Sequence, residues 1–451
     1  MIRHTFLSRW LPHCVLTAGL SAIATGLAAQ EAPALVANAA TPGISLALVL
    51  QSAARNLGVQ QAQRSLEASR ADVLSANHAP LPNLTLRAAS IDLQNGVGNS
   101  SASGLNDWRV DKSVGIDVVW ERGNKRALRT QTSEQLVSAA QADVHETQAQ
   151  QQIQAAVAFF DWAAAQQRES LMQAMAQSAQ QLHQATQRRL TAGDVSEQDA
   201  DRIAIEWSKA QGDVAQARSD RHRTALLLQQ LTGLPGPPAQ WQAQLSWPSA
   251  PPAGASEWRA AQIQAWVEAR SDVMAAQQRW MAARSALELA QSLKKKDITW
   301  GGAYDHYPPN SNSLLELRVQ IPLHWGYGFE GEIGRATAQL QQAEVALERA
   351  RIAAQTDIND AAQVLRNTQE RLQLFDSQIL PRAQKIAAQA DYAYQKGGLS
   401  LTDLIEARRT LRSTQLDALS VRAEHAKAQT QWDIRTQYGS QMRNPQTANT
   451  P

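Results

Sequence analysis

Two stretches of the chain alternate between apolar and polar residues with a period of two. In residues 112–121 the apolar side includes Val114 and Ile116, and residues 315–323 repeat the pattern. Such alternation predicts β-strands with one apolar face. A membrane barrel with a wet lumen is built from strands of this kind, but a soluble sheet with one buried face explains the alternation equally well. With less regular partners, the predicted strand pairs are 83–93 with 112–121, and 298–307 with 315–323.

Helices are predicted after each strand pair. Residues 124–192 contain neither Gly nor Pro, and a helix of about 65 residues spans about 100 Å. After a sharp turn, apolar and small residues return at spacings of three and four, which is typical of a coiled-coil seam. Long antiparallel helical hairpins follow. The seam residues include Ile203, Trp207, Ala210, Val214 and Ala217 in the first half, and Leu404, Ala407, Leu411, Thr414 and Ala418 in the second.

The chain repeats this plan with a period near 205 residues. Segments 192–199 and 396–403 share a Gly, an aliphatic residue, a Ser and an Asp at the same offsets. This similarity predicts two structural repeats, each with a helix, a strand pair and a long hairpin. The expected division is a first repeat at 30–232 with its tip near 193–199, a Pro-rich linker outside the helices at 233–256, a second repeat at 257–439 with its tip near 397–403, and a polar tail at 440–451.

The N-terminal residues predict export. Arg3, His4 and Arg9 precede an uncharged run that ends in small residues, so residues 1–29 are interpreted as a cleaved signal peptide. A membrane anchor is the weaker interpretation, because the run is short and lacks a stop-transfer flank. The only cysteine, Cys14, lies in this segment, so no disulfide is expected. Since no later apolar run reaches about 20 residues, membrane entry is expected through strands.

The number of strands per chain predicts how many chains assemble. Four strands per chain cannot close a barrel, because known membrane barrels begin at about eight strands, but three chains would supply twelve. The predicted fold is therefore mainly α with a membrane β-barrel. It has two structural repeats, long antiparallel coiled-coil hairpins, and four strands per chain contributing to a trimeric 12-stranded barrel.

Composition and spacing exclude several functions. Aromatic residues make up 5% of the chain, which fits long helices packed through small side chains better than several compact cores. The net charge of +2 comes without a basic stripe, so nucleic acid is not an expected partner. No enzyme, cofactor or metal site is predicted, since no nucleophile–base set or phosphate loop occurs and no histidines have ligand spacing. The mature chain has histidines at 78, 145, 183, 222, 306, 324 and 425.

Residues 394–407, YQKGGLSLTDLIEA, resemble the hairpin tip of the TolC family of outer-membrane factors. The resemblance covers nearly the whole mature chain, and residues 331–336 after the strand at 319–323 are similar to the heavy-metal-cation efflux (CzcC-like) branch. It implies a homotrimer in the outer membrane of a Gram-negative bacterium, with a helical tube in the periplasm. It also implies a periplasmic adaptor (membrane fusion) protein, an inner-membrane resistance–nodulation–division pump, contact with outer-membrane lipid, and no catalytic residues.

The expected function is a passive duct of a tripartite efflux system, with heavy-metal cations as the expected cargo. Drug efflux or type I secretion is the alternative within the same class. A periplasmic coiled-coil adaptor or scaffold without a pore is the alternative from another class, but no compact β-domain of the adaptor kind is evident between the hairpins.

The tip residues have two compatible interpretations. Their Ser-x-x-Asp spacing predicts helix caps, formed by Ser196 with Asp199 and Ser400 with Asp403, and Arg202 is placed to neutralise Asp199. The family resemblance implies instead that three copies of Asp403 and Glu406 ring a periplasmic gate, which would attract cations. It also implies adaptor contacts at Gly193, Val195, Ser196, Gly397, Leu399 and Ser400. Leu399 stands where some members have a basic constricting residue, so a salt-bridge latch is not expected there.

Residues beside the strands predict a membrane boundary. Trp300, Tyr304, Tyr307 and Trp325 are expected to form an aromatic girdle. The run 294–296, three consecutive lysines, is interpreted as solvated or in contact with anionic headgroups.

Overall fold

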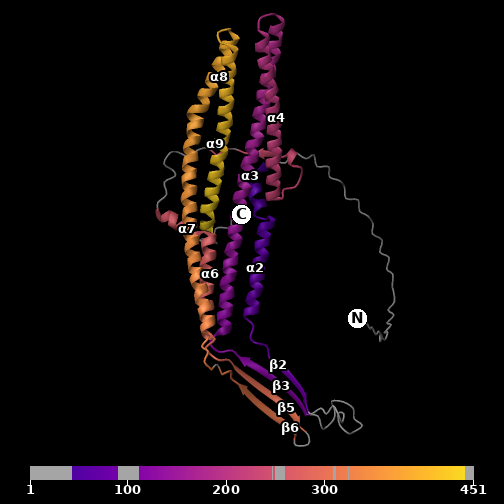
Figure 1. Ribbon diagram of the computed structural model, residues 1–451, viewed down its shortest axis with the longest axis vertical. Coiled ribbons are helices and arrows are strands. Elements are labelled where there is room, and N and C mark those ends of the chain that lie inside the picture. Colours follow the sequence, from indigo (N-terminus) through magenta and orange to yellow (C-terminus); the bar gives the residue numbers. More distant parts are fainter. Residues whose placement is uncertain are drawn as a thin grey trace, which may run out of the picture. The chain divides into compact units, whose positions relative to one another are not determined.

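A computed structural model describes residues 43–89, 111–245, 247–248, 260–307, 311–323 and 325–441. These residues belong to one compact unit that begins at Thr41. The predicted signal peptide, the loop after the first strand, His324 and all but the first two residues of the polar tail lie outside the described residues. Figure 1 shows long helices with a sheet at one end and helical hairpin tips at the other.

The sheet has four antiparallel strands in the order β2-β3-β5-β6. The register pairs Val114 with Tyr304 and Tyr304 with Leu315, so the alternating apolar residues share one face. The strands are β2 (Asn83–Ala89), β3 (Asp111–Trp120), β5 (Ile298–Tyr307) and β6 (Ser311–Gln320).

The bounds of β6 correct the predicted strand 315–323. It begins four residues earlier, at Ser311, because pairing with β5 overrides the weak strand propensity of a Ser-Asn-Ser sequence. It ends at Gln320, before Pro322, which has no N–H to donate to a ladder. β3, which pairs with β2 and β5, is displaced by one residue from the predicted 112–121, and β2 is described only as far as Ala89.

The first half of the described chain contains two short helices and one long hairpin. α1 (Leu46–Ala53) and α2 (Leu57–Ala76) begin at the side-chain caps Ser45 and Asn56. The stretch without Gly or Pro forms a single helix, α3 (Lys125–Thr191), of 67 residues, which is about 100 Å long. α4 (Glu197–Thr232) returns along it and ends at Gly233 in the left-handed conformation.

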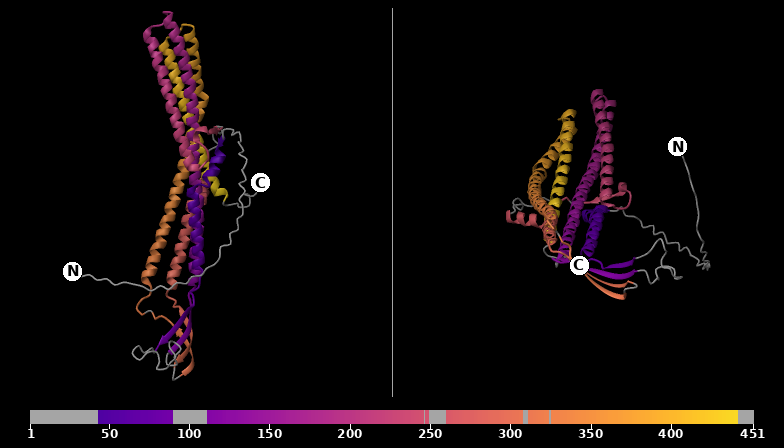
Figure 2. Two further views of the ribbon diagram at one scale, coloured as in Figure 1. Left: turned by 90° about the vertical axis from the view of Figure 1, so that its right-hand side faces the viewer. Right: turned by 60° about the horizontal axis from the view of Figure 1, so that its bottom comes forward.

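The second half has the same order of elements with an interrupted outgoing helix. α5 (Ala260–Ala269) and α6 (Ser271–Ser292) precede the strands, and α7 (Glu330–Leu374), η2 (Phe375–Ile379), α8 (Leu380–Gln395) and α9 (Leu401–Gln441) follow them. η2 is a π-helical turn, in which the Leu380 N–H donates to Phe375 O. Pro381 explains the interruption, since it has no N–H for an α-helical bond. Figure 2 shows α7 and α8 as one continuous path through this turn.

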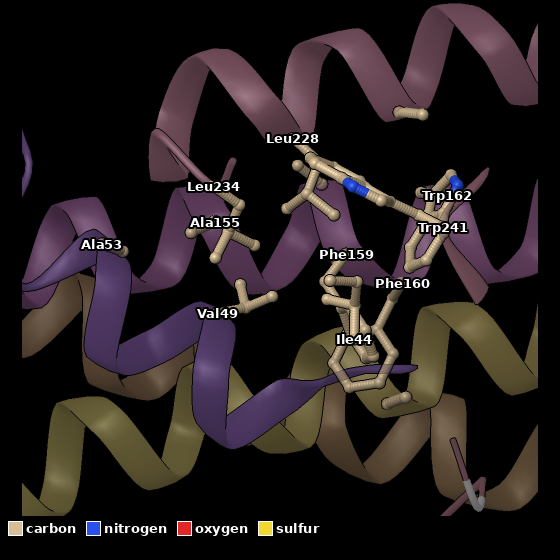
Figure 3. Close-up of a cluster of buried hydrophobic side chains, with 13 residues drawn as sticks. Ile44, Val49, Ala53, Ala155, Phe159, Phe160, Trp162, Leu228, Leu234 and Trp241 are labelled. Atoms are coloured by element: carbon tan, nitrogen blue, oxygen red, sulfur yellow. The ribbon is translucent and has the colours of Figure 1, made fainter. Parts of the chain in front are cut away.

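The described part of the Pro-rich segment lies between α4 and α5 and also contributes to the core. β4 (Gln242–Gln244) pairs in parallel with β1 (Gly43–Ser45), directly after the short η1 (Pro238–Gln240). Trp241 is fully buried, and its ring meets that of Trp162 edge-on at 6.1 Å. Figure 3 shows this cluster, which also contains Ile44, Val49, Phe159 and Leu228. Burial of a large aromatic residue ties the segment to the hairpin α3–α4.

A second core cluster lies in the other half of the described chain. Trp266 of α5 meets Trp432 of α9 edge-on at 5.2 Å, and Ile358 of α7 is buried beside them. Arg270, between α5 and α6, is only 6% exposed and pairs with Asp272 at 2.7 Å and Asp357 at 3.1 Å. These two carboxylates compensate the buried charge and raise the pKa of the guanidinium against the lowering effect of burial.

None of the helices in the described part of the chain has both the length and the apolar run needed to cross a membrane.

Candidate functional site

The two hairpin tips are built in the same way. Gly193 N–H donates to Leu190 O at 3.0 Å, and Asp194 N–H donates to Arg189 O at 2.9 Å. In the second tip, Gly397 N–H donates to Tyr394 O at 3.0 Å, and Gly398 N–H donates to Ala393 O at 2.9 Å. This is the Schellman arrangement, which requires a left-handed residue after the helix. Gly193 and Gly397 supply it with φ of 80° and 75°.

Each returning helix begins with a serine cap. Ser196 Oγ accepts from the Asp199 N–H at 3.1 Å and donates to Asp199 Oδ2 at 2.8 Å. Ser400 makes the same pair of bonds with Asp403, at 3.1 and 2.7 Å. The acidic side chain also complements the helix dipole. Around these caps the glycines and serines are exposed, while the aliphatic residues Val195 and Leu399 are half-buried.

Polar side chains connect the two hairpins near their tips. Arg202 of α4 donates to Thr402 Oγ1 of α9 at 2.8 Å, where the sequence suggested a role in neutralising Asp199. Arg409 of α9 pairs with Glu206, and further along Arg412 pairs with Asp213. The guanidinium of Arg189 in α3 lies 5.6 Å from the ring of Tyr394 in α8, within the range of a cation–π interaction.

Sequence reasoning did not find these contacts, although a signal for them exists. The partners are separated by 200, 203 and 199 residues, which is close to the spacing of the two similar tip segments. Residues at equivalent places in the two hairpins therefore lie opposite each other. Opposite charges at this offset indicate the two ion pairs, Arg409 with Glu206 and Arg412 with Asp213, whereas the bond from Arg202 to Thr402 carries no such signal.

Asp403 and Glu406 lie one turn apart at the start of α9. The side chain of Glu406 is 72% exposed, and its nearest cation is Arg409, at 3.8 Å. A groove between α4 and α9 is lined by the acids Glu197, Asp201, Glu206 and Glu406 together with the cations Arg202, Lys209 and Arg409. The exposed carboxylate of Glu406 is thus available to act on ions near the tip.

Next to this groove, an apolar cavity of about 300 Å³ lies between the hairpins. Leu171, Met175 and Leu182 of α3 contribute apolar walls, and Arg408 pairs there with Asp391 at 2.7 Å. The hairpins are therefore less tightly packed here than in the two core clusters.

The sheet has one apolar face that is exposed. Gly301, on the opposite face, leaves room for the ion pair of Asp117 with Arg318 at 3.1 Å, since a Cβ on it would come within 2.2 Å of Asp117 Oδ1. An exposed apolar surface of this extent marks a lipid or protein partner. Its side chains, each between 43% and 81% exposed, are Leu84, Leu86, Val114, Ile116, Val118, Trp120, Trp300, Tyr304, Leu315, Leu317 and Val319.

The four residues of the predicted aromatic girdle lie on this face, beside it or at the far end of β5. Trp300 and Tyr304 belong to the face, and Trp325, beyond the end of β6, is 85% exposed. Tyr307 is half-buried at the far end of β5, where a register irregularity separates Asp305 and Tyr307.

The described residues contain no group of three His, Cys, Asp or Glu side chains placed to hold a metal ion. His425, on the predicted seam, is fully buried, and its Nδ1 lies 3.5 Å from Thr368 Oγ1. Burial lowers the pKa of His425 and that of His145, which favours neutral imidazoles packed between helices.

Comparison with known proteins shows which families and solved structures this chain resembles. Residues 48–234 match the family model described as outer membrane efflux protein. The cobalt-zinc-cadmium resistance protein CzcC of Cupriavidus metallidurans is 23% identical over 434 residues, covering 96% of this chain and 99% of the relative. The CmeC outer membrane channel of Campylobacter jejuni has a TM-score of 0.73 at 13% identity, covering 90% of each chain. The Neisseria gonorrhoeae MtrE outer membrane channel has a TM-score of 0.67 at 17% identity, covering 87% of this chain and 88% of that one.

The fold is similar to that of these solved outer membrane channels, with long helices and a four-stranded antiparallel sheet. Over residues 48–234, the chain is similar to the outer membrane efflux protein family.

Proposed function

We propose that three copies of the chain form one duct, a twelve-stranded barrel continued by a helical tube. The apolar face of the sheet supports this, because it can be turned toward lipid while the polar face lines the lumen. The strand order supports it too, since β2 and β6 are edge strands within the described sheet. Edges of this kind require a partner, and joining β6 of one chain to β2 of the next closes the barrel.

The proposed cargo is heavy-metal cations, carried passively out of the cell as part of a tripartite efflux system. The observation that carries this proposal is the end-to-end similarity to a cobalt-zinc-cadmium resistance protein. A ring of Asp403 and Glu406 carboxylates from three chains would favour cations at the periplasmic entrance. An inner-membrane resistance–nodulation–division pump would drive transport, and a periplasmic adaptor would connect that pump to the duct.

The tips are the proposed adaptor contacts. Both present exposed glycine and serine beside a half-buried aliphatic residue, which suits a close approach by another helical hairpin. The proposed contact residues are Gly193, Val195 and Ser196 in the first tip and Gly397, Leu399 and Ser400 in the second.

Drug efflux or type I secretion remains the alternative cargo assignment within the same class. A scaffold without a pore is disfavoured, because the family match is to efflux proteins.

A deletion strain tests the cargo. Its growth would be measured on graded Co, Zn, Cd, Ni and Cu salts, on dyes and on antibiotics, with and without the gene on a plasmid. We expect at least a fourfold loss of tolerance to one or more of the metals, restored by the plasmid. Unchanged metal tolerance together with new sensitivity to dyes or antibiotics would contradict the metal assignment and favour drug efflux.

A further inference from the structure

A cluster of basic side chains lies where the helices meet the sheet. Arg122 follows β3, and three lysines, Lys294, Lys295 and Lys296, precede β5. We call these four residues the rim cluster. Trp120 and Ile298 are paired in the ladder, so both parts of the cluster lie at the same end of the sheet. Figure 1 shows α3 and α6 reaching the sheet at this end.

The two turns that carry the rim cluster are held together. Lys125 is only 7% exposed, and its Nζ donates to Lys295 O at 2.9 Å and to Asp297 Oδ1 at 2.7 Å. The N–H of Arg122 donates to the same Asp297 oxygen at 2.9 Å. A Cβ on Gly123, which has φ of 81°, would lie 3.0 Å from Lys295 Cδ. The backbone of the cluster is therefore fixed, and its side chains project from a rigid base.

The nearby acids are already paired with other groups. Asp297 is held by Lys125, and Glu121 pairs with Arg129 at 2.6 Å. Segments 121–129 and 294–297 carry seven basic and two acidic side chains, a net charge of +5. Within the described residues, no ion pair joins any side chain of the rim cluster to an acid.

The acids at the start of α7 are engaged in their own loop. Glu330 accepts from the Gly328 N–H at 3.0 Å, and Glu332 accepts from the Tyr327 hydroxyl. The positive charge at the rim thus lacks a compensating group in the described chain.

We infer that the rim cluster binds the phosphate groups of anionic phospholipids in the periplasmic leaflet of the outer membrane. The cluster continues directly from the apolar face, with the exposed indole of Trp120 two residues from Arg122. A lipid whose acyl chains lie on that face would bring its headgroup to the end of the sheet where the lysines are. Arg122, Lys294 and Lys295 are exposed, and Lys296 is half-buried, so several phosphates can be contacted at once.

This inference rests on the outer-membrane location and does not depend on the cargo. The metal-tolerance experiment can therefore fail while lipid binding holds, and the reverse is equally possible.

Native mass spectrometry of the trimer tests the inference. Trimers in neutral detergent would be mixed with phosphatidylglycerol or phosphatidylcholine at equal mole fraction, and the lipids retained by each trimer counted. Each basic residue near an anionic lipid surface contributes about fivefold in affinity. We expect Arg122→Gln/Lys294→Gln/Lys295→Gln/Lys296→Gln to lose more than tenfold in phosphatidylglycerol affinity and to retain phosphatidylcholine unchanged.

Three controls separate charge from structure and lipid from free anion. The charge-conserving variant Lys294→Arg/Lys295→Arg/Lys296→Arg should retain phosphatidylglycerol. Neutralising four exposed cations on the helices, Arg168, Arg349, Arg382 and Lys385, should also leave retention unchanged. Inorganic phosphate at constant ionic strength should not displace the lipid, because acyl chains anchor the headgroup.

Equal phosphatidylglycerol retention by the wild type and the quadruple glutamine variant would overturn the inference. So would an equal loss in the control with four neutralised helix cations, or displacement of the lipid by inorganic phosphate. If the quadruple glutamine variant does not assemble into trimers, the phosphatidylglycerol affinity of the double variant Lys294→Gln/Lys296→Gln is measured in its place. It leaves Lys295 packed over Gly123, and we expect it to lose about tenfold or more in affinity.

Discussion

Arg202 of α4 donates a 2.8 Å hydrogen bond to the hydroxyl of Thr402 in α9, one residue before Asp403. The first hairpin is thereby attached to the start of the returning helix that carries the proposed gate. Arg409 with Glu206 adds an ion pair one turn further along. Any motion that separates the hairpins must break these contacts.

Charge reversal at Glu206 should therefore loosen the contact between the two hairpins. Exposed ion pairs contribute about 0.2–1 kcal/mol each, so Glu206→Arg should raise the open probability in planar bilayers by up to about fivefold. The swap Glu206→Arg/Arg409→Glu should return it toward the wild-type value. Glu67→Arg, which breaks an exposed pair within α2, is the matched control. A swap that opens the channel as much as the single change would argue against a direct link.

Gly397→Val should abolish export while leaving trimers in the membrane. A left-handed residue with a Cβ costs about 1–2 kcal/mol, and a β-branched residue is still less compatible with the φ of 75° in this tip. The distortion is local, because no atom lies within 4 Å of the added Cβ. Export assays and trimer recovery would be compared with Gly398→Ala, whose Cβ would have an ordinary contact at 3.7 Å. Normal export by the valine variant would count against the tip as the adaptor contact.

Glu406→Ala should weaken cation selectivity and block by multivalent cations in planar bilayers. The side chain is 72% exposed and is not part of the Ser400 cap. Asp403→Ala should add to the effect but also weakens the cap, at a cost of about 1 kcal/mol. Glu344→Ala removes an exposed acid from α7 and should leave selectivity unchanged. Unaltered selectivity in the double variant, with trimers intact, would mean that these acids do not line the pore.

Trp241→Ala should destabilise the fold by about 3–5 kcal/mol, because a fully buried indole leaves a cavity in the first core cluster. Leu74→Ala, at a position that is 77% exposed in the chain, should change stability by less than about 0.5 kcal/mol. Thermal unfolding followed by near-UV circular dichroism would show the difference. Equal midpoints for the two variants would contradict a structural role for the Pro-rich segment.

The long helices and the apolar face of the sheet could be predicted because each depends on a local pattern. The prediction of a helix through 124–192 rested only on the absence of Gly and Pro. The prediction of the strands rested only on the alternation of apolar and polar residues. The predicted strand 315–323 was wrong at both ends. Pairing with β5 extends β6 back to Ser311 through polar residues, and the strand ends at Gln320, before Pro322. The π-helical turn before Pro381 was not predicted. The effect of this proline on the hydrogen bonds of the preceding residues leaves no pattern of its own in the sequence.

The candidate site was predictable only within each tip. The serine caps follow from the four-residue motif Ser-x-x-Asp, whereas Arg202 was associated with Asp199 because the two are close in sequence. In the structure its partner is 200 residues away. The packing of Trp241 was hidden for a similar reason, because a Pro-rich composition indicates irregular backbone and does not show whether a side chain between the prolines is buried.

Metal retention in whole cells tests the central proposal most directly. A deletion strain carrying the wild-type gene, the Gly397→Val gene or an empty plasmid would be loaded with zinc, cobalt and cadmium, transferred to metal-free medium, and sampled for cellular metal over time. The account predicts rapid loss of at least one metal with the wild-type gene, and retention of that metal with the variant and with the empty plasmid. Identical loss from all three strains for every metal would contradict a heavy-metal efflux duct.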